Sequence, residues 1–309
     1  MKMEIHFELT LKCLFNCIHC SGSAFKDYDH VELSKIQTRL KKLEALKGDI
    51  AELVLTGGEP LLREDLNDII RFSSVPANSV TLFTTGNAMG KIPSISDWEE
   101  YNSSGLDKVV FSVHSIDENV NNAYFRANVL KNTLESIKKA GAAGMKVQTN
   151  CVLTKKNIGS VDQTIYALTS DYGVEKVRLL RFVSQGRGVE QNDELYVDPA
   201  TSKEIIIALK EKYGGLFHAE GFPSLHRCRS NEYIGPGCQL GTGFFYIDTK
   251  GDVLPCPAVK RNLHTRLGNI DGCQYIKRLF YFGAKIAEGI DARDDEFRCL
   301  SQASWKENS

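Results

Sequence analysis

Hydrophobic and polar positions repeat with two different periods along the first two thirds of the chain. Short runs of Val, Ile, Leu and Phe, each bounded by turn residues, indicate strands. Between these runs, apolar residues recur every three or four positions, as at Ile36, Leu40 and Leu43, which is typical of amphipathic helices. The predicted strands are residues 4–9, 52–56, 80–84, 108–113, 146–152 and 176–180. Helices are predicted at 36–43 and around 66–72, 97–101, 129–140 and 161–168.

Six strands that are each followed by a helix imply a parallel sheet with right-handed crossovers. We therefore predict an α/β fold, a partial (β/α)6 barrel, whose chemistry lies at the carboxyl ends of the strands. After residue 184 the composition changes, and the polar, glycine-containing stretch 184–193 is typical of a loop or linker. We expect a barrel domain over residues 1–190 and a smaller, cysteine-rich domain over 191–309. In the second domain we predict a helix at 202–212, a hairpin of 244–247 with 252–254, and an amphipathic stretch at about 275–287.

Composition and charge exclude several classes of protein. The chain is 42% hydrophobic and 25% charged, as in ordinary globular proteins, and its 38 basic and 39 acidic residues give a net charge of -1. This balance does not favour binding to nucleic acid or to an anionic membrane. The N-terminal residues contain no apolar signal core, and no window reaches the roughly 18–20 apolar residues of a membrane span. We expect a soluble, cytoplasmic protein.

Three of the nine cysteines, Cys13, Cys17 and Cys20, lie close together after the first predicted strand. An odd number of cysteines without a secretion signal argues against a disulfide framework. Three thiolates at this spacing can bind three irons of a cubane iron–sulfur cluster and leave the fourth iron open to another ligand. A zinc knuckle is the alternative, but zinc sites favour paired CxxC spacing and a fourth protein ligand.

A second motif, Gly57-Gly58-Glu59-Pro60, ends the second predicted strand. Two glycines allow a small ligand to approach the backbone closely and leave amide groups free to recognise it. Taken alone, this tetrapeptide is also compatible with an ordinary tight loop.

Together the two motifs resemble the CxxxCxxC and GGEP signatures of the radical S-adenosylmethionine (SAM) superfamily. The resemblance implies a [4Fe–4S] cluster on Cys13, Cys17 and Cys20, with SAM bound at the open iron. It also implies that reductive cleavage of SAM yields a 5′-deoxyadenosyl radical, which abstracts hydrogen from a substrate. SAM-binding roles follow for His19, which stands where the family usually has an aromatic residue, and for the four residues of the second motif, Gly57, Gly58, Glu59 and Pro60.

The resemblance also assigns SAM-binding roles to two further residues. Ser112, at the end of the fourth predicted strand, matches a family serine that meets the SAM ribose or carboxylate. Arg126 stands near the position of an arginine that pairs with that carboxylate, for which its forked geometry is suited. Each also has an ordinary explanation, as a strand-end or surface residue.

The later cysteines resemble the start of the SPASM and twitch extensions, which carry auxiliary iron–sulfur clusters. The resemblance rests on Cys238, Gly251 and Cys256, but the later run of four closely spaced cysteines of full SPASM domains is absent. We therefore expect one auxiliary cluster, of the [4Fe–4S] type. Its expected ligands are Cys228, Cys238, Cys256 and Cys299, and Cys273 competes for one position. An open auxiliary site that binds substrate, and unrelated free cysteines, are the alternatives.

The sequence determines the substrate less than any other part of the predicted function. Enzymes with such extensions most often modify ribosomally made peptides, so the first hypothesis is a peptide maturase that forms cross-links or thioethers or inverts a stereocentre. A small-molecule dehydrogenase or cyclase is the alternative, and a non-catalytic iron–sulfur electron carrier is a third. The expected partners are a peptide or small-molecule substrate and a reductant such as flavodoxin or ferredoxin.

Overall fold

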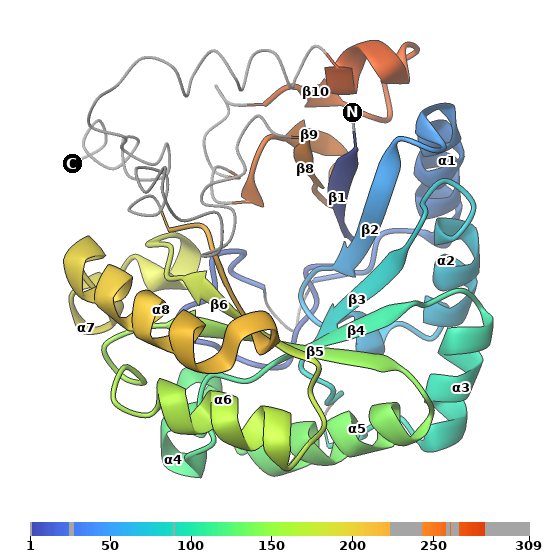
Figure 1. The fold of residues 1–309 in the computed structure, drawn as a ribbon. Helices are drawn as coiled ribbons and strands as arrows, with labels where there is room; N and C mark the ends of the chain where they lie inside the picture. The colour runs from blue at the N-terminus through green and yellow to red at the C-terminus, as the bar shows by residue number, and fades with distance from the viewer. Residues whose placement is uncertain are drawn as a thin grey trace.

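A single ten-stranded sheet forms the wall of the molecule (Figure 1). The computed structural model describes residues 2–24, 28–88, 90–222, 243–257, 260 and 266–281. Strands β1 to β8 pair in parallel, in the order β8-β1-β2-β3-β4-β5-β6-β7, and β9 and β10 extend the β8 edge antiparallel. The strands are β1 (Met3–Glu8), β2 (Ile50–Thr56), β3 (Val80–Thr84), β4 (Lys108–Ser112), β5 (Lys146–Leu153), β6 (Lys176–Arg181), β7 (Phe217–Glu220), β8 (Phe244–Ile247), β9 (Asp252–Leu254) and β10 (Gly268–Asn269).

The helices pack on the outer face of this sheet (Figure 1). Ile36 and Leu40 of the first helix join Phe7 of β1 in the main hydrophobic core, as the helical period of the sequence predicts. The local sequence sets the start of the helix at Ile95–Ser103, because Ser94 forms a capping box with Asp97. The helices are α1 (Leu33–Leu43), α2 (Leu66–Ser73), α3 (Ile95–Ser103), α4 (Glu118–Phe125), α5 (Leu130–Ala142), α6 (Val161–Ser170), α7 (Asn192–Leu195) and α8 (Pro199–Tyr213).

The inner face of the curled sheet is polar. Arg178 of β6 forms a two-pronged ion pair with Glu220 of β7, at 2.8 and 2.7 Å. The same guanidinium lies 5.3 Å from the ring centroid of Phe83 in β3. Since these strands are far apart in the sheet order, their side chains meet across the interior of a partial barrel. The interior therefore contains paired charges, while the main apolar core lies between the sheet and the helices.

The predicted fold class is confirmed, with a parallel barrel sheet and a small antiparallel extension. All six predicted strands are present, and the predicted hairpin has the same limits as β8 and β9. Four elements were not predicted: α4, whose asparagine-rich sequence has a weak helical period, and α7, β7 and β10, which are each at most four residues long. The division at residue 190 stays a prediction, and the described strands on either side of it share one sheet.

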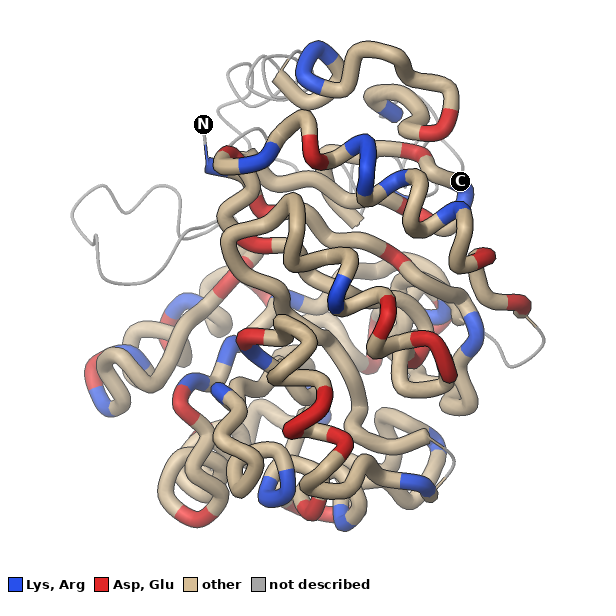
Figure 2. The backbone as a smooth tube through the Cα atoms, turned by 90° about the vertical axis from the view of Figure 1, so that its right-hand side faces the viewer, with Lys and Arg blue, Asp and Glu red and all other residues tan. Residues whose placement is uncertain are grey.

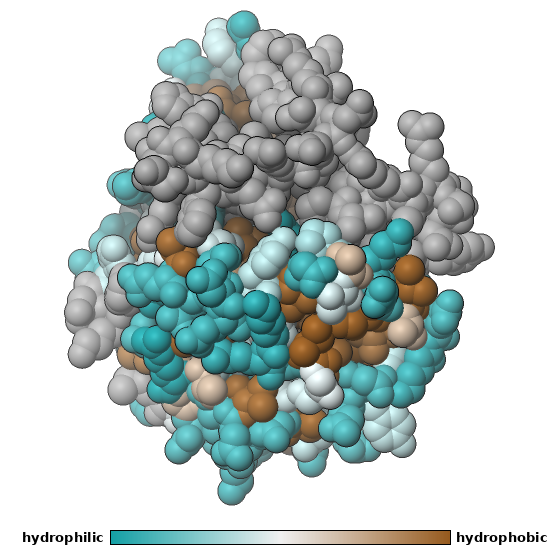
Figure 3. Space-filling view, turned by 90° about the vertical axis from the view of Figure 1, so that its left-hand side faces the viewer, coloured by the Kyte–Doolittle hydropathy of each residue, from teal (hydrophilic) through white to brown (hydrophobic). Residues whose placement is uncertain are grey.

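Charges of both signs are mixed on one side of the molecule. Figure 2 shows basic and acidic residues interspersed on the side that carries α1, α2 and α3. On the face seen from the left of Figure 1, hydrophobic residues gather in a patch among hydrophilic ones (Figure 3). Within the described part of the chain, no helix has the length and apolar character to cross a membrane.

Candidate functional site

The loop that carries Cys13, Cys17 and Cys20 follows β1 at the carboxyl edge of the barrel. Its apolar residues bury it, since Cys13, Phe15 and Ile18 form a second hydrophobic cluster with aromatic residues of α4. The backbone N–H of Ile18 donates to the carbonyl of Tyr124, at 2.9 Å. The missed helix α4 is thus the surface on which the cysteine loop rests.

The Gly57-Gly58 pair holds the start of this loop by backbone contacts. The N–H of Gly58 donates to the carbonyl of Thr10 at 2.7 Å, and the N–H of Glu59 donates to the carbonyl of Lys12 at 2.9 Å. A Cβ atom on Gly58 would lie 2.6 Å from the carbonyl carbon of Lys12, closer than real side chains approach. Gly57 has a φ of +151°, which disfavours other residues. The glycines therefore have a structural role here, and their contact with SAM stays a prediction.

Glu59 is fully buried, and its carboxylate accepts hydrogen bonds from other residues of the protein. It accepts hydrogen bonds from the Thr84 hydroxyl at 2.6 Å, from the Thr85 hydroxyl at 2.6 Å and from the Thr85 N–H at 2.8 Å. The N–H of Leu61 donates to it as well, at 3.0 Å, and Pro60 begins the short turn that brings this N–H into place. Burial raises the pKa of Glu59, opposed by these hydrogen bonds. Glu59 thus ties the loop after β2 to the loop after β3.

A second clamp on the cysteine loop comes from the segment after β6. The Arg187 side chain donates to the carbonyl of Cys17 at 2.9 Å and to that of Ala24 at 2.8 Å. Its backbone N–H donates to the carbonyl of Cys20 at 3.1 Å. Gly186 has a φ of +57°, and a Cβ there would lie 2.6 Å from the carbonyl oxygen of Ser21. The sequence predicted only a loop or linker here. The Gly-Arg-Gly sequence at 186–188 could have indicated a close backbone contact beside a charged side chain.

Burial favours the protonated form of two thiols of the loop, those of Cys13 and Cys17. It raises the pKa of Cys13 to about 12 and that of Cys17 well above its ordinary value. Nearby thiolate charge at Cys20 and Cys13 raises the pKa of Cys17 further. Such buried thiols ionise only beside a strong positive charge such as iron.

Cys13, Cys17 and Cys20 lie within eight residues on one loop. In a cubane, each cysteine binds a different iron, so three cysteines leave one iron without a protein ligand. A closed zinc site needs a fourth protein ligand, and no three His, Cys, Asp or Glu side chains converge on one metal position in the described ranges. The donor set suits an iron–sulfur cluster, and Cys13, Cys17 and Cys20 stay its predicted ligands.

Two neutral histidines lie beside the cysteines. The rings of His19 and His114 are 4.4 Å apart, edge to face, and Phe125 stacks on His114 at 5.3 Å. Burial lowers the pKa of His19 to about 4 and that of His114 well below its ordinary value. The N–H of Val152 donates to His114 Nδ1 at 3.2 Å, which places the proton of a neutral ring on Nε2. His19 Nδ1 has no hydrogen-bond partner among the described residues, and its place beside the SAM adenine stays a prediction.

Ser112 and Arg126 lie at different depths. Ser112 ends β4, where it is partly buried and pairs in register with Asn150 of β5. Arg126 is exposed and ends α4 with a left-handed backbone, at a φ of +52°. Both stay predictions as SAM-binding residues. Only Ser112 lies on a strand that lines the barrel.

The structure describes two of the C-terminal cysteines. Cys256 follows β9 and is partly buried, and Cys273 is partly buried against the main core. Cys228, Cys238 and Cys299 lie outside the described residues. The auxiliary ligand set, with Cys273 as the competitor, therefore stays a prediction.

Known proteins resemble this chain in sequence. The Radical SAM superfamily profile matches residues 7–165, just over half of the chain. An AdoMet-dependent heme synthase from Methanosarcina barkeri is 26% identical over 82% of this chain and 76% of its own length. A PqqA peptide cyclase from Streptomyces rochei is 26% identical, over 81% and 68%. A probable GTP 3′,8-cyclase from Sulfurisphaera tokodaii is 32% identical, but over 60% of this chain and only 58% of its own length.

The fold has solved counterparts. Streptococcus suis SuiB bound to S-adenosylmethionine superposes with a TM-score of 0.75, covering 98% of this chain and 71% of SuiB at 17% identity. SuiB bound to its precursor peptide SuiA superposes with a TM-score of 0.74, covering 97% of this chain and 69% of SuiB, also at 17% identity. The match extends over the barrel and the C-terminal extension. With the profile match over residues 7–165, the chain is a radical SAM enzyme and belongs to the radical SAM superfamily.

Proposed function

We propose that this enzyme is a peptide maturase that uses Cys13, Cys17 and Cys20 to hold its SAM-binding [4Fe–4S] cluster. The observation that carries the cluster assignment is the cysteine loop itself, which is buried and clamped through its backbone by Gly58 and Arg187. When bound, the cluster and SAM supply one-electron chemistry and a hydrogen-abstracting 5′-deoxyadenosyl group.

The residues of this chain position the cysteine loop, exclude water from it and bind SAM. The glycine and Arg187 clamps hold the loop of the three cysteines through its backbone groups. The aromatic cluster around Tyr124 and Phe125 excludes water from one side of the loop. Ser112 and Arg126 are proposed to bind the polar groups of SAM, together with His19 and the Gly57–Pro60 segment.

Peptide substrates are favoured by two similarities. The PqqA peptide cyclase matches most of this chain, and SuiB has been solved with its precursor peptide. The small-molecule alternative also has specific support, since the heme synthase and the GTP cyclase are matched at comparable identity. Auxiliary-cluster ligation by Cys228, Cys238, Cys256 and Cys299 belongs to either version of the proposal, and flavodoxin or ferredoxin would supply the electrons.

The first test measures 5′-deoxyadenosine from anaerobically reconstituted, dithionite-reduced protein with added SAM. Wild type is expected to form it, and a variant with Cys13, Cys17 and Cys20 all changed to Ala is not. Cys151→Ala is the matched control, because Cys151 is a buried cysteine of β5 outside the loop. Equal activity of the triple variant and wild type would overturn the cluster assignment.

The second test separates the two substrate classes. Short reading frames beside the gene are synthesised as peptides and incubated with the reduced enzyme and SAM. A peptide mass change that depends on SAM and on Cys13 supports the maturase proposal. A neighbourhood of small-molecule biosynthesis genes, with no modified peptide, would replace it with the dehydrogenase or cyclase alternative.

A further inference from the structure

Two buried histidine nitrogens beside the cysteine loop have no hydrogen-bond partner among the described residues. They are Nε2 of His114, which follows β4, and Nδ1 of His19, which lies between Cys17 and Cys20. The two rings touch, with their centroids 4.4 Å apart and their planes at 80°. A buried polar atom without a partner is costly, so two such atoms on touching rings point to an interaction between them.

The other polar groups of His114 are held by the protein. Its backbone N–H donates to Oδ1 of Asn121 at 2.9 Å, and its carbonyl accepts from Nδ2 of Asn157 at 2.7 Å. The N–H of Val152 in β5 donates to the ring at Nδ1, at 3.2 Å. Asn121 and Asn157 are themselves fully buried. The backbone and the ring of His114 are therefore fixed, and only Nε2 is left to act on a neighbour.

The contact with Val152 also determines what the free nitrogen of His114 can do. A ring nitrogen that accepts a hydrogen bond carries no proton, so the proton of the neutral His114 ring is on Nε2. The free atom of His114 is therefore a donor. A neutral His19 ring has one donor and one acceptor nitrogen, and Nδ1 can be the acceptor. The two unpartnered atoms are thus chemically complementary.

Aromatic packing keeps the two histidines together. The Phe125 ring stacks on His114 at 5.3 Å, and the Tyr124 ring lies 4.7 Å from His114 and 5.4 Å from His19. The N–H of Ile18, the residue before His19, donates to the Tyr124 carbonyl at 2.9 Å. Both rings are therefore enclosed between α4 and the cysteine loop. Rotation of the His19 ring about its Cβ–Cγ bond is the movement that can join the two nitrogens.

We propose that His114 is a positioning residue, which donates from Nε2 to Nδ1 of His19 and so fixes the orientation and the tautomer of the His19 ring. A ring that accepts at Nδ1 carries its proton on Nε2. His19 then presents an N–H donor at its other nitrogen, within the cysteine loop. This inference rests on the proposed function, in which His19 lies beside SAM, because a fixed donor there favours a ligand with a hydrogen-bond acceptor.

The first test reads the tautomer of His19 directly. Full-length protein labelled with ¹⁵N-histidine is studied by nuclear magnetic resonance, with its oxidised, diamagnetic cluster and again without it. The signals of His19 are assigned by their loss in His19→Asn. Wild type is expected to carry the proton of His19 on Nε2 alone.

Two substitutions of His114 separate its donor from its shape. His114→Phe retains a ring but has no donor, so the two tautomers of His19 should mix and its ring signals should move toward their average. His114→Gln supplies a side-chain N–H near the position of Nε2 and is expected to restore the single tautomer. A single Nε2–H tautomer in His114→Phe, or a mixture in wild type, would overturn the positioning role.

The second test measures SAM binding without turnover, by calorimetry on the oxidised protein with its cluster. The Kd of SAM is expected to rise about tenfold in His114→Phe, the effect of one hydrogen bond, and to recover in His114→Gln. An unchanged Kd in His114→Phe would contradict the link between this pair and SAM.

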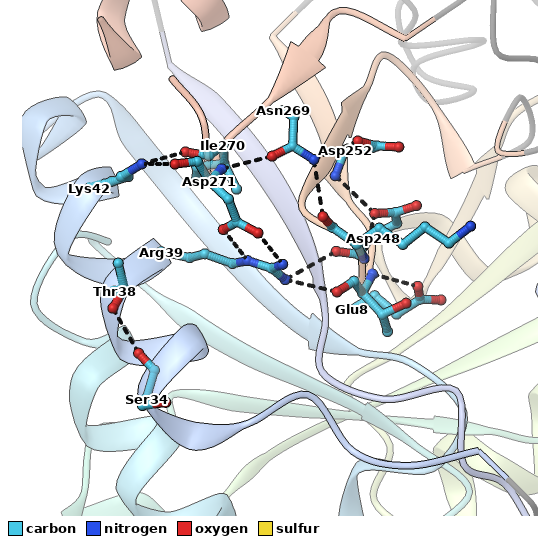
Figure 4. A network of polar contacts seen from close by, with 12 residues as sticks. Glu8, Ser34, Thr38, Arg39, Lys42, Asp248, Asp252, Asn269, Ile270 and Asp271 are labelled. Carbon is cyan, nitrogen blue, oxygen red and sulfur yellow. Dashed lines mark hydrogen bonds and ion pairs between the residues drawn. The ribbon is translucent and has the colours of Figure 1, made fainter. Parts of the chain in front are cut away.

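Arg39→Lys is the control for a general loss of stability. Arg39 of α1 is fully buried and makes two 2.7 Å contacts with the Asp271 carboxylate of the extension (Figure 4). This variant should melt at a lower temperature, while the His19 tautomer and the Kd of SAM stay as in wild type. A change in the His19 tautomer in Arg39→Lys would mean that the tautomer reports stability rather than His114.

The two tests also separate this inference from the proposed function. If wild type did not bind SAM, but the tautomer of His19 still depended on His114, the proposed function would fail and the pairing of the histidines would stand. If wild type bound SAM, but the tautomer of His19 did not depend on His114, only the positioning role would fail.

Discussion

The loop that carries Cys13, Cys17 and Cys20 and the hairpin that leads to Cys256 are both anchored to the barrel, by different kinds of contact. The loop is held largely through backbone groups, at glycines that allow close approach. The hairpin is held largely through charged side chains, Glu8, Arg39 and their partners. The loop therefore depends on shape and the hairpin on charge.

This difference implies that the two regions can be perturbed separately. A backbone hydrogen bond has no titrating group, so the backbone contacts that hold the loop do not depend on pH, whereas the ion pairs that hold the hairpin do. Conversely, an added methyl group would disrupt the loop and leave the hairpin intact.

Gly58→Ala is expected to have the largest effect. The new methyl group would collide with the backbone of Lys12 and displace Cys13, and a displacement of about 1 Å can cost on the order of a hundredfold in rate. Iron content and 5′-deoxyadenosine formation check this. Gly141→Ala is the control, because nothing lies within 4 Å of a Cβ there. Normal iron content in Gly58→Ala would contradict the backbone clamp.

Glu8→Gln is expected to destabilise the protein by about 3 kcal/mol, because it leaves the partly buried Lys260 ammonium without its counter-charge. Adding Lys260→Met to it should recover most of this loss, since removing both charges leaves no unpaired ion. Urea unfolding of the apoprotein under anaerobic conditions measures both values. Additive losses in the double variant would mean that the two residues do not act as a pair.

Arg187→Lys tests the side-chain part of the loop clamp. Loss of the forked contacts with the carbonyls of Cys17 and Ala24 should cost about 1–3 kcal/mol, the range for hydrogen bonds to charged groups. In Arg187→Lys, 5′-deoxyadenosine formation is expected to fall, while hydrogen exchange at the hairpin stays unchanged. Arg71→Lys is the control, because Arg71 forms an exposed ion pair with Asp68, and it should change neither 5′-deoxyadenosine formation nor hydrogen exchange.

The smallest effect concerns pH. The hydrogen bonds from Arg39 hold the pKa of Asp271 below its usual value of 3.8. The stability contributed by this carboxylate is therefore complete above pH 3.8 and is lost as the pH falls through the lower folded-state pKa. Hydrogen exchange at the hairpin of the apoprotein should rise in that range, and Asp271→Asn should remove the dependence. A pH response of the cysteine loop that also disappeared in Asp271→Asn would contradict the separation of the two regions.

Much of this architecture could be read from the sequence, because the signals are local. The strand periods, the β8–β9 hairpin and the CxxxCxxC and GGEP motifs each occupy a short stretch. Neighbouring residues determine the backbone conformation of such stretches, so their spacing alone indicates the fold and the family. The helix α4 was missed because its asparagine-rich sequence has a weak helical period, and β7 was missed because four residues carry too little periodicity.

Only the tertiary structure decided which distant residues meet. Arg39 and Asp271 are 232 positions apart, and Arg187 and Cys17 are 170 positions apart. No local pattern marks such pairs, because a charged residue in a helix or loop is more often exposed than paired. The closure of the sheet into a barrel brings the ends of β1, β2 and β6 to one edge, and the parallel pairing of β8 with β1 brings the extension beside them. The sequence by itself therefore determined the chemistry of the cysteine loop, while packing determined what holds it and what lies next to it.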